Sequence, residues 1–160
     1  SKKMANLTSY ENRSFPSWLS SEENNFEFSF KKSSLLRKEE FLTNYKNNGF
    51  EVKISSRELA ILEFIDSLDL TSSLETAQNY TESLQTLRPE VMQEVLEKFN
   101  SVKAKRVFLF LAEKLSLKFV DNLDLSRISL GTGKRVIVEG GELNKKYQIT
   151  VDRTYGENPF

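Results

Sequence analysis

The chain has 160 residues and contains neither cysteine nor histidine. Disulfide bonds, serine–histidine or cysteine–histidine nucleophiles and the usual zinc and iron–sulfur ligands are therefore excluded. The 23 basic residues equal the 23 acidic residues, so no net charge draws the whole chain towards nucleic acid or a membrane. No apolar run has the length of a membrane span and no signal peptide is visible, so we expect one cytoplasmic domain over residues 1–160 without a membrane partner.

The first third of the chain, residues 1–54, is predicted to be rich in β-structure. Its polar start contains one apolar island at 15–19, which we interpret as an irregular segment that Trp18 anchors to the core. Residues 25–32 alternate three phenylalanines with polar residues, a pattern typical of a half-buried strand. Residues 50–54 repeat this alternation directly after an Asn-Asn-Gly turn signal.

The hydrophobic period changes to that of a helix at Ser55, and residues 55–117 are predicted to form about four helices with short joints. Serine and threonine residues before the helices supply caps, and Pro89 suits the first turn of a helix. The last helix, residues 101–115, contains six consecutive apolar residues, VFLFLA. Because a helix that is apolar on nearly every side must be surrounded, we expect the other helices to pack around it.

The remaining part, residues 118–152, is predicted to end in a C-terminal β-hairpin. Gly-Thr-Gly at 131–133 turns the chain, and residues 135–139 and 147–151 have the composition of two strands joined by a glycine-containing loop. The predicted fold class is therefore α+β, with a β-rich first third, about four helices around the central helix 101–115, and a C-terminal hairpin.

Charge is distributed unevenly along the sequence. Residues 51–97 contain three basic and ten acidic residues, a net charge of −7, and residues 98–135 contain nine basic and three acidic residues, a net charge of +6. The basic segment offers five candidate residues for binding a partner or nucleic acid: Lys103, Lys105, Arg106, Lys134 and Arg135. The first three lie near the start of the central helix, where the helix dipole disfavours cations, so they need acidic neighbours or an anionic partner.

The same cations also have a purely structural interpretation. Cations around a core helix and at hairpin ends also serve solubility alone, and Arg106 then pairs internally with one of three acids: Glu90, Glu94 or Glu113. The functional interpretation instead requires one exposed basic face, formed by at least four of the cations: Lys103, Arg106, Lys134 and Arg135. Such a face would attract an acidic protein surface or a phosphate backbone.

No motif points to catalysis. The segment Gly131-Thr132-Gly133-Lys134-Arg135 lacks the spacing and the following helix of a phosphate-binding loop. Asp66 and Asp69 share a helix face and could hold a hard cation weakly, although a solvated helix end is the simpler interpretation. Without histidine or cysteine, a general base would have to be a carboxylate or lysine with a shifted pKa, and none stands out. We therefore predict no enzymatic activity, no catalytic residue, no cofactor and no metal site.

Several blocks of the sequence resemble the C-terminal domain of AbiEi-type antitoxins, the antitoxin and transcriptional-regulator halves of type IV toxin–antitoxin systems. The resemblance covers about residues 14–152 and is strongest over residues 86–151. Seven blocks carry it, in the order and spacing of the family: FPSWL at 15–19, SSRELAILE at 55–63, TLRP at 86–89, SVKAKRVFLFLAE at 101–113, LDLS at 123–126, LGTGKR at 130–135 and KYQITV at 146–151.

This resemblance implies a non-enzymatic antitoxin domain from a bacterial abortive-infection system. Such a domain counteracts a nucleotidyltransferase-like toxin, with or without a stable complex, and belongs to a transcriptional autoregulator that binds promoter DNA. The family's winged-helix domain has no counterpart in these blocks, so we expect the C-terminal domain alone. At residues 56–58 the chain has Ser-Arg-Glu where the family commonly has Pro-Glu-Arg. The alternatives are a regulatory domain that itself contacts DNA and, least favoured, an enzyme.

Overall fold

The structure is a computed structural model that divides into two compact units, residues 1–37 and 38–160. It describes four ranges of the chain: residues 3–10, 26–33, 39–47 and 49–156. The irregular segment that the sequence predicts around Trp18 lies outside these described residues.

The first unit contains a pair of parallel strands. β1 (Lys3–Tyr10) pairs with β2 (Phe26–Ser33) over the full length of both strands. β2 confirms the strand predicted at residues 25–32. β1 has no alternating pattern that would predict a strand, since its sequence KMANLTSY mixes polar and apolar residues. Its extended backbone is instead stabilised by the ladder that it shares with β2.

The second unit begins with an antiparallel hairpin. β3 (Leu42–Asn47) pairs with β4 (Phe50–Ser55), and a short 3-10 helix, Glu39–Phe41, precedes them. Gly49 lies in the turn with a φ of 89°, a left-handed conformation that glycine adopts without a steric penalty. β4 confirms the strand predicted at residues 50–54.

After the hairpin, the described residues form four successive helices: α1 (Arg57–Ser67), α2 (Leu70–Glu82), α3 (Pro89–Lys98) and α4 (Val102–Lys114). The side chains of Ser56, Asp69 and Ser101 each accept a hydrogen bond from a backbone N–H in the first turn of the helix that follows. α3 starts at Pro89, whose missing N–H costs nothing at that position. The four predicted helices are confirmed, as are the serine caps of α1 and α4. α2 differs from the prediction, because Asp69 caps it and the serine and threonine residues expected to precede it lie inside the helix.

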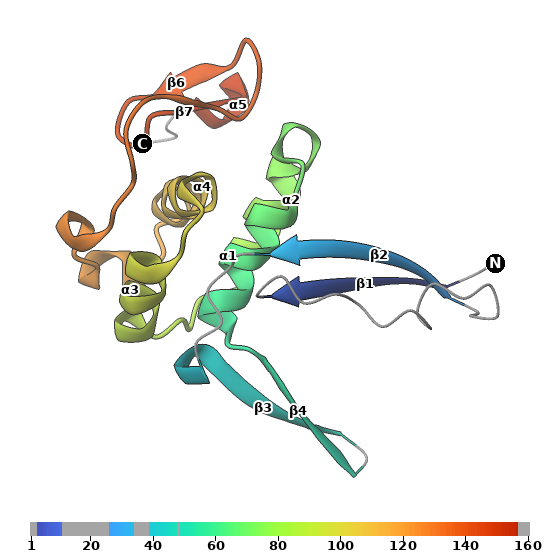
Figure 1. The fold of residues 1–160 in the computed structure, drawn as a ribbon. Helices are drawn as coiled ribbons and strands as arrows, with labels where there is room; N and C mark the ends of the chain where they lie inside the picture. The colour runs from blue at the N-terminus through green and yellow to red at the C-terminus, as the bar shows by residue number, and fades with distance from the viewer. Residues whose placement is uncertain (1–2, 11–25, 34–38, 48, 157–160) are drawn as a thin grey trace. The chain divides into compact units, whose positions relative to one another are not determined.

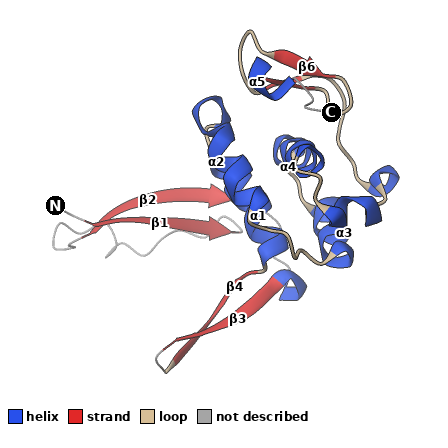
Figure 2. Cartoon of the chain, turned by 180° about the vertical axis from the view of Figure 1, so that it is seen from behind, coloured by secondary structure: helices blue, strands red, loops and turns tan. Residues whose placement is uncertain are grey.

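α4 is the centre of the second unit, as predicted for residues 101–115. Every residue from Ala104 to Ala112 is buried, and α1 and α2 both pack against this helix. Figures 1 and 2 show α4 with α1 and α2 on one side, α3 on another and the C-terminal strands beyond it. Exposing any one large side chain of this helix would cost about 1.5–3 kcal/mol, so its position is fixed by burial.

Two 3-10 helices, Lys118–Asn122 and Leu125–Arg127, connect α4 to a small sheet. Its strands lie in the order β5 (Arg135–Val136), β7 (Ile149–Val151) and β6 (Glu142–Asn144), and a short helix α5 (Arg153–Gly156) follows. β6 and β7 are antiparallel and form a hairpin at the C-terminal end of the described residues. The α+β fold class is thereby confirmed.

The pairing of β5 differs from the prediction. β5 and β7 are parallel, whereas the sequence suggested that residues 135–139 and 147–151 form the two arms of a hairpin. The chain turns at Gly140 and Gly141, so residues 142–144 take the antiparallel position on the other edge of β7. A Cβ atom on Gly141 would lie 2.2 Å from the carbonyl oxygen of Val151, so only glycine permits this close approach.

An ion pair between buried Glu58 and exposed Arg88 joins the starts of α1 and α3. Glu58 is 1% exposed, and its carboxylate accepts hydrogen bonds from Nε and Nη2 of Arg88 at 2.9 Å and from the Arg88 backbone N–H at 3.2 Å. Burial by itself raises the pKa of Glu58, but the hydrogen bonds and the charge of Arg88 outweigh it and lower the pKa from 4.5 to about 2. Glu58 therefore remains ionised and ties the two helices together.

We expect this pair to make stability depend on acid. Because the pKa of Glu58 is lower in the folded chain, its contribution is present above the unfolded value of 4.5 and is lost as the pH falls towards 2. Glu58→Gln should lower the free energy of unfolding by about 2 kcal/mol at neutral pH and should flatten this part of the pH profile. Urea unfolding at about pH 7 and about pH 3 measures both effects.

The matched control is Glu75→Gln, which removes an exposed carboxylate from α2. It should change the free energy of unfolding by less than about 0.5 kcal/mol at either pH. Equal pH profiles for wild type and Glu58→Gln would contradict the role given to the Glu58–Arg88 pair.

Candidate functional site

The start of α4 is fixed by the end of α1. Ser101 caps α4, and its hydroxyl also donates a hydrogen bond to the carboxylate of Asp66 at 2.5 Å. Lys103 is half-buried, and its Nζ donates to the carbonyl oxygen of Asp66 at 3.4 Å. This carbonyl belongs to the last turn of α1, where the helix dipole is negative. The first cation of the predicted basic face therefore finds its acceptor within the molecule.

Arg106 lies inside the second unit and organises the loop of residues 130–135. Its side chain is 2% exposed, and its guanidinium donates hydrogen bonds only to backbone carbonyl oxygens. The distances are 2.7 Å from Nε to Leu130, 2.6 Å and 3.1 Å from Nη1 to Gly133 and Gln148, and 3.1 Å from Nη2 to Gly131. The planar, five-donor shape of arginine suits such a ring of acceptors, which a lysine could not serve at once.

The loop around Arg106 has the backbone conformations that this arrangement needs. Gly131 and Gly133 have φ values of 63° and 76°, and Gln148 has a φ of 53°, which is uncommon for a residue other than glycine. These left-handed residues lie among those whose carbonyl oxygens accept hydrogen bonds from Arg106. The loop geometry and the buried cation therefore depend on each other.

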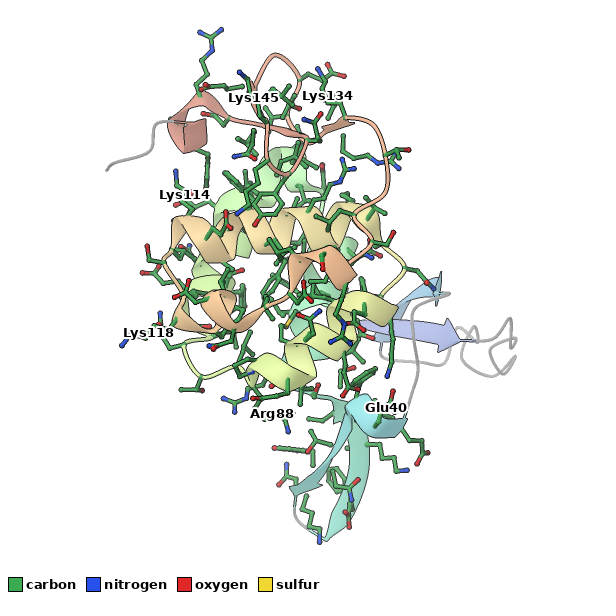
Figure 3. The ribbon with its side chains drawn as sticks, turned by 90° about the vertical axis from the view of Figure 1, so that its left-hand side faces the viewer. Glu40, Arg88, Lys114, Lys118, Lys134 and Lys145 are labelled. Carbon is green, nitrogen blue, oxygen red and sulfur yellow. The ribbon has the colours of Figure 1, made fainter. Side chains whose placement is uncertain are left out.

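Lys134 and Arg135 are the exposed part of this loop. Neither forms an ion pair with the described residues, although seven such pairs occur elsewhere among them. Burial, and then the positive charge of Arg135, lower the pKa of Arg106. Figure 3 shows Lys134 and Lys145 on the side of the C-terminal sheet, at the opposite edge from Arg88 and Glu40.

The structure corrects the predicted exposed face at two positions. Lys105 and Arg106 are 3% and 2% exposed, because α4 is enclosed on every side over this stretch. Burial lowers the pKa of Lys105. The internal partners suggested for Arg106 were also wrong, since it binds carbonyl oxygens and not a carboxylate. Of the five predicted residues, Lys134 and Arg135 are exposed, and we call these two residues the basic loop. Lys103 is half-buried and does not belong to it.

Further charged and aromatic residues lie beside the C-terminal sheet. Lys146 forms an ion pair with Glu113 of α4 and lies over the ring of Tyr147. Tyr147 is 2% exposed, and burial followed by the nearby Glu113 raises the pKa of its hydroxyl. A pocket of about 380 Å³ lies alongside, lined by residues of α4, β6 and α5 that include Glu113, Lys114 and Lys145. Tertiary contacts bring these residues together: α5 packs against β6, and Nζ of Lys114 donates a hydrogen bond to the carbonyl oxygen of Tyr155 at 3.0 Å.

The chain was compared with known proteins. Residues 2–152 match a family described as transcriptional regulator, AbiEi antitoxin, type IV toxin–antitoxin system. The chain belongs to this AbiEi antitoxin family. The match confirms the resemblance seen in the sequence blocks, and it covers both units of the structure. No curated protein and no solved structure gave a match in the same comparisons.

The described residues of this AbiEi family member were also searched for membrane-spanning helices and metal sites. None of the helices among them is long and apolar enough to cross a membrane. Within the same residues, no three acidic side chains gather in a way that could hold a metal ion, and Asp66 is instead engaged by Ser101. The features of the site that remain are the basic loop and its buried support, Arg106.

We expect Arg106→Lys to loosen the loop in this antitoxin family chain. A single ammonium group replaces at most part of the four hydrogen bonds, so the free energy of unfolding should fall by about 3 kcal/mol. Amide hydrogen exchange over residues 130–135 should accelerate with it. Arg135→Lys is the control: it keeps the charge on an exposed residue and should leave both measurements at wild-type values, while an unchanged Arg106→Lys variant would refute the support role.

The two loop glycines provide a second test. Gly131→Ala and Gly133→Ala both place a side chain at a positive φ, at a cost of about 1–2 kcal/mol. A Cβ on Gly131 would also lie 3.1 Å from Cγ2 of Val102, whereas nothing lies within 4 Å of one on Gly133. Gly131→Ala should therefore be the more destabilising change in thermal unfolding, and combining it with Val102→Ala should recover the difference. Equal effects of the two glycine changes would show that the packing on α4 does not matter.

Proposed function

We propose that this chain is a non-enzymatic antitoxin domain that acts in the cytoplasm against a nucleotidyltransferase-like toxin and belongs to a transcriptional autoregulator. Membership of the AbiEi antitoxin family supports the antitoxin and regulatory parts of this proposal. The identity of the toxin rests on the resemblance to AbiEi-type systems. The observation in the structure that carries the proposal is the basic loop, Lys134 and Arg135.

The loop has the properties of a binding surface. Both cations are exposed and have no ion-pair partner among the described residues, so an incoming anionic group would not have to displace an internal partner. The loop backbone next to them is held by the hydrogen bonds that Arg106 donates to Leu130, Gly131 and Gly133, so little conformational entropy is lost when the loop binds. A positive loop on a rigid support is suited to an acidic face of the toxin or to a phosphate backbone.

The chemistry of the chain supports the non-enzymatic part of the proposal. It has no histidine and no cysteine, the side chains that most often serve as general base or nucleophile near neutral pH. Among the described residues, the carboxylate with the most strongly lowered pKa, Glu58, is buried against Arg88 and is unsuited to accept a proton. These features support a binding protein over a catalyst.

The second candidate is a regulatory domain that itself contacts DNA. It is favoured by the same basic loop, because Lys and Arg side chains on a rigid loop are the usual contacts to phosphate groups. The two candidates differ in their dependence on salt: contacts to DNA phosphates lose affinity steeply as salt rises, by about one unit of log–log slope for each contact.

We expect Lys134→Glu/Arg135→Glu to abolish protection against the toxin encoded beside the chain, because the double change turns a positive surface negative. Growth of cells that express the toxin, with and without the variant, measures the loss, which should be at least about tenfold in surviving colonies. The matched control is Arg57→Glu/Lys118→Glu, which makes the same change of charge at two exposed cations outside the loop and should protect like wild type.

Promoter binding by the same variants separates the two candidates. Loss of protection with unchanged DNA binding supports a toxin-directed surface, and loss of DNA binding with a reduced salt slope supports the second candidate. If the folded double variant keeps both activities, the basic loop is not the functional surface. A genome in which no nucleotidyltransferase-like gene accompanies this one would contradict the proposed toxin.

A further inference from the structure

The β3–β4 hairpin carries an apolar surface that the proposed function does not use. Its register places three cross-strand pairs on one face: Thr43 opposite Ile54, Tyr45 opposite Val52, and Asn47 opposite Phe50. Four large side chains of this face are exposed: Tyr45 by 49%, Phe50 by 55%, Val52 by 42% and Ile54 by 43%. We call these four residues the apolar stripe.

The base of the hairpin is fixed to the helices. Phe41 directly precedes β3 and is 2% exposed, and its carbonyl oxygen accepts a hydrogen bond from the N–H of Ser56 at 2.8 Å. Lys98 of α3 lies over the Phe41 ring and pairs with Glu40 at 2.9 Å. Figure 2 shows β3 and β4 extending away from the helices beyond this base. The apolar stripe is therefore presented by an anchored element and not by a loose end.

The charges of the hairpin lie on its other face and are paired there. Lys46 contacts Glu51 at 3.6 Å, and Lys53 contacts Glu39 at 2.7 Å. The apolar stripe itself contains no charge, so two such stripes can meet without bringing like charges together. An isolated two-stranded hairpin is only marginally stable in water, so covering the stripe would stabilise it.

We propose that the apolar stripe binds the same stripe of a second copy of this chain. An uncharged surface is its own complement, which is the requirement of a two-fold, isologous interface, the commonest arrangement of soluble oligomers. Regulators of transcription commonly use such a two-fold dimer to read two half-sites. In the dimer the two hairpins stack face to face and form a small four-stranded sandwich with Tyr45 and Val52, the central pair, beside the two-fold axis.

The size of the stripe indicates that the dimer is weak. Four half-exposed side chains offer about 350 Å² per copy, below the roughly 800 Å² per partner of a stable interface. We therefore expect monomers at about 5 µM and dimers at about 500 µM, in rapid exchange. Sedimentation equilibrium of the 160-residue chain over this range measures the change.

A charge inside the stripe should abolish the association. Val52→Asp should raise the dimer dissociation constant at least tenfold, because it buries an unpaired carboxylate at the two-fold axis. The matched control is Asn44→Asp, which adds the same charge to the opposite face of the hairpin, next to Lys53, and should dimerise like wild type. Far-ultraviolet circular dichroism and the thermal midpoint establish that each variant is folded.

Cross-linking tests the geometry without an added charge. Because the chain contains no cysteine, Val52→Cys and Asn44→Cys each introduce a single thiol. A short bismaleimide should link Val52→Cys into covalent dimers at high concentration and should leave Asn44→Cys monomeric. The proposal is overturned if wild type remains monomeric throughout, or if both thiols cross-link equally.

If the chain remains monomeric, the rate of thiol labelling shows whether the apolar stripe is covered or free. A monomer whose Val52→Cys thiol reacts slowly with a soluble maleimide has its stripe covered by another segment of the same chain. A monomer whose thiol reacts rapidly leaves the stripe free for a different protein. Either outcome leaves the test of the basic loop unaffected, since that test depends on Lys134 and Arg135.

Discussion

The guanidinium of Arg106 is the interaction on which the C-terminal part of this structure depends. Four backbone carbonyl oxygens from residues 130–148 converge on it, and the residue itself belongs to α4, the most buried of the described helices. Buried carbonyl groups without donors would each cost about 1–3 kcal/mol, and a buried cation without acceptors would cost more. Each half of the arrangement therefore requires the other, and the loop takes its position from the core.

Glu58 does the corresponding work at the other side of the second unit. The carboxylate of Glu58 accepts hydrogen bonds from Arg88, and the guanidinium of Arg106 donates hydrogen bonds to carbonyl oxygens. In both cases a charged side chain fixes backbone that has no sheet or helix partner of its own. The consequence is a division among the charged residues. Charged residues in the interior bind groups of the same chain, whereas exposed ones such as Lys134 and Arg135 can bind a partner.

Two surfaces of the AbiEi family chain thus have contrasting chemistry. The basic loop lies on the C-terminal sheet and is positive, while the apolar stripe lies on the β3–β4 hairpin and is uncharged. Electrostatic attraction acts over several ångströms and sets the rate of encounter, whereas apolar contact acts only at close approach. In our proposals, the basic loop binds an anionic partner and the apolar stripe joins two copies of the chain.

The sequence alone determined the α+β class, the starts of α1, α3 and α4, and the central position of residues 101–115. These features follow from local chemistry: caps, the proline at residue 89 and the hydrophobic period act within one or two turns. Tertiary structure decided the parallel pairing of β5 with β7 and the burial of Lys105 and Arg106. No periodicity shows that a cation will find carbonyl oxygens from residues 24–42 positions away, because that contact exists only once the loop has folded onto α4.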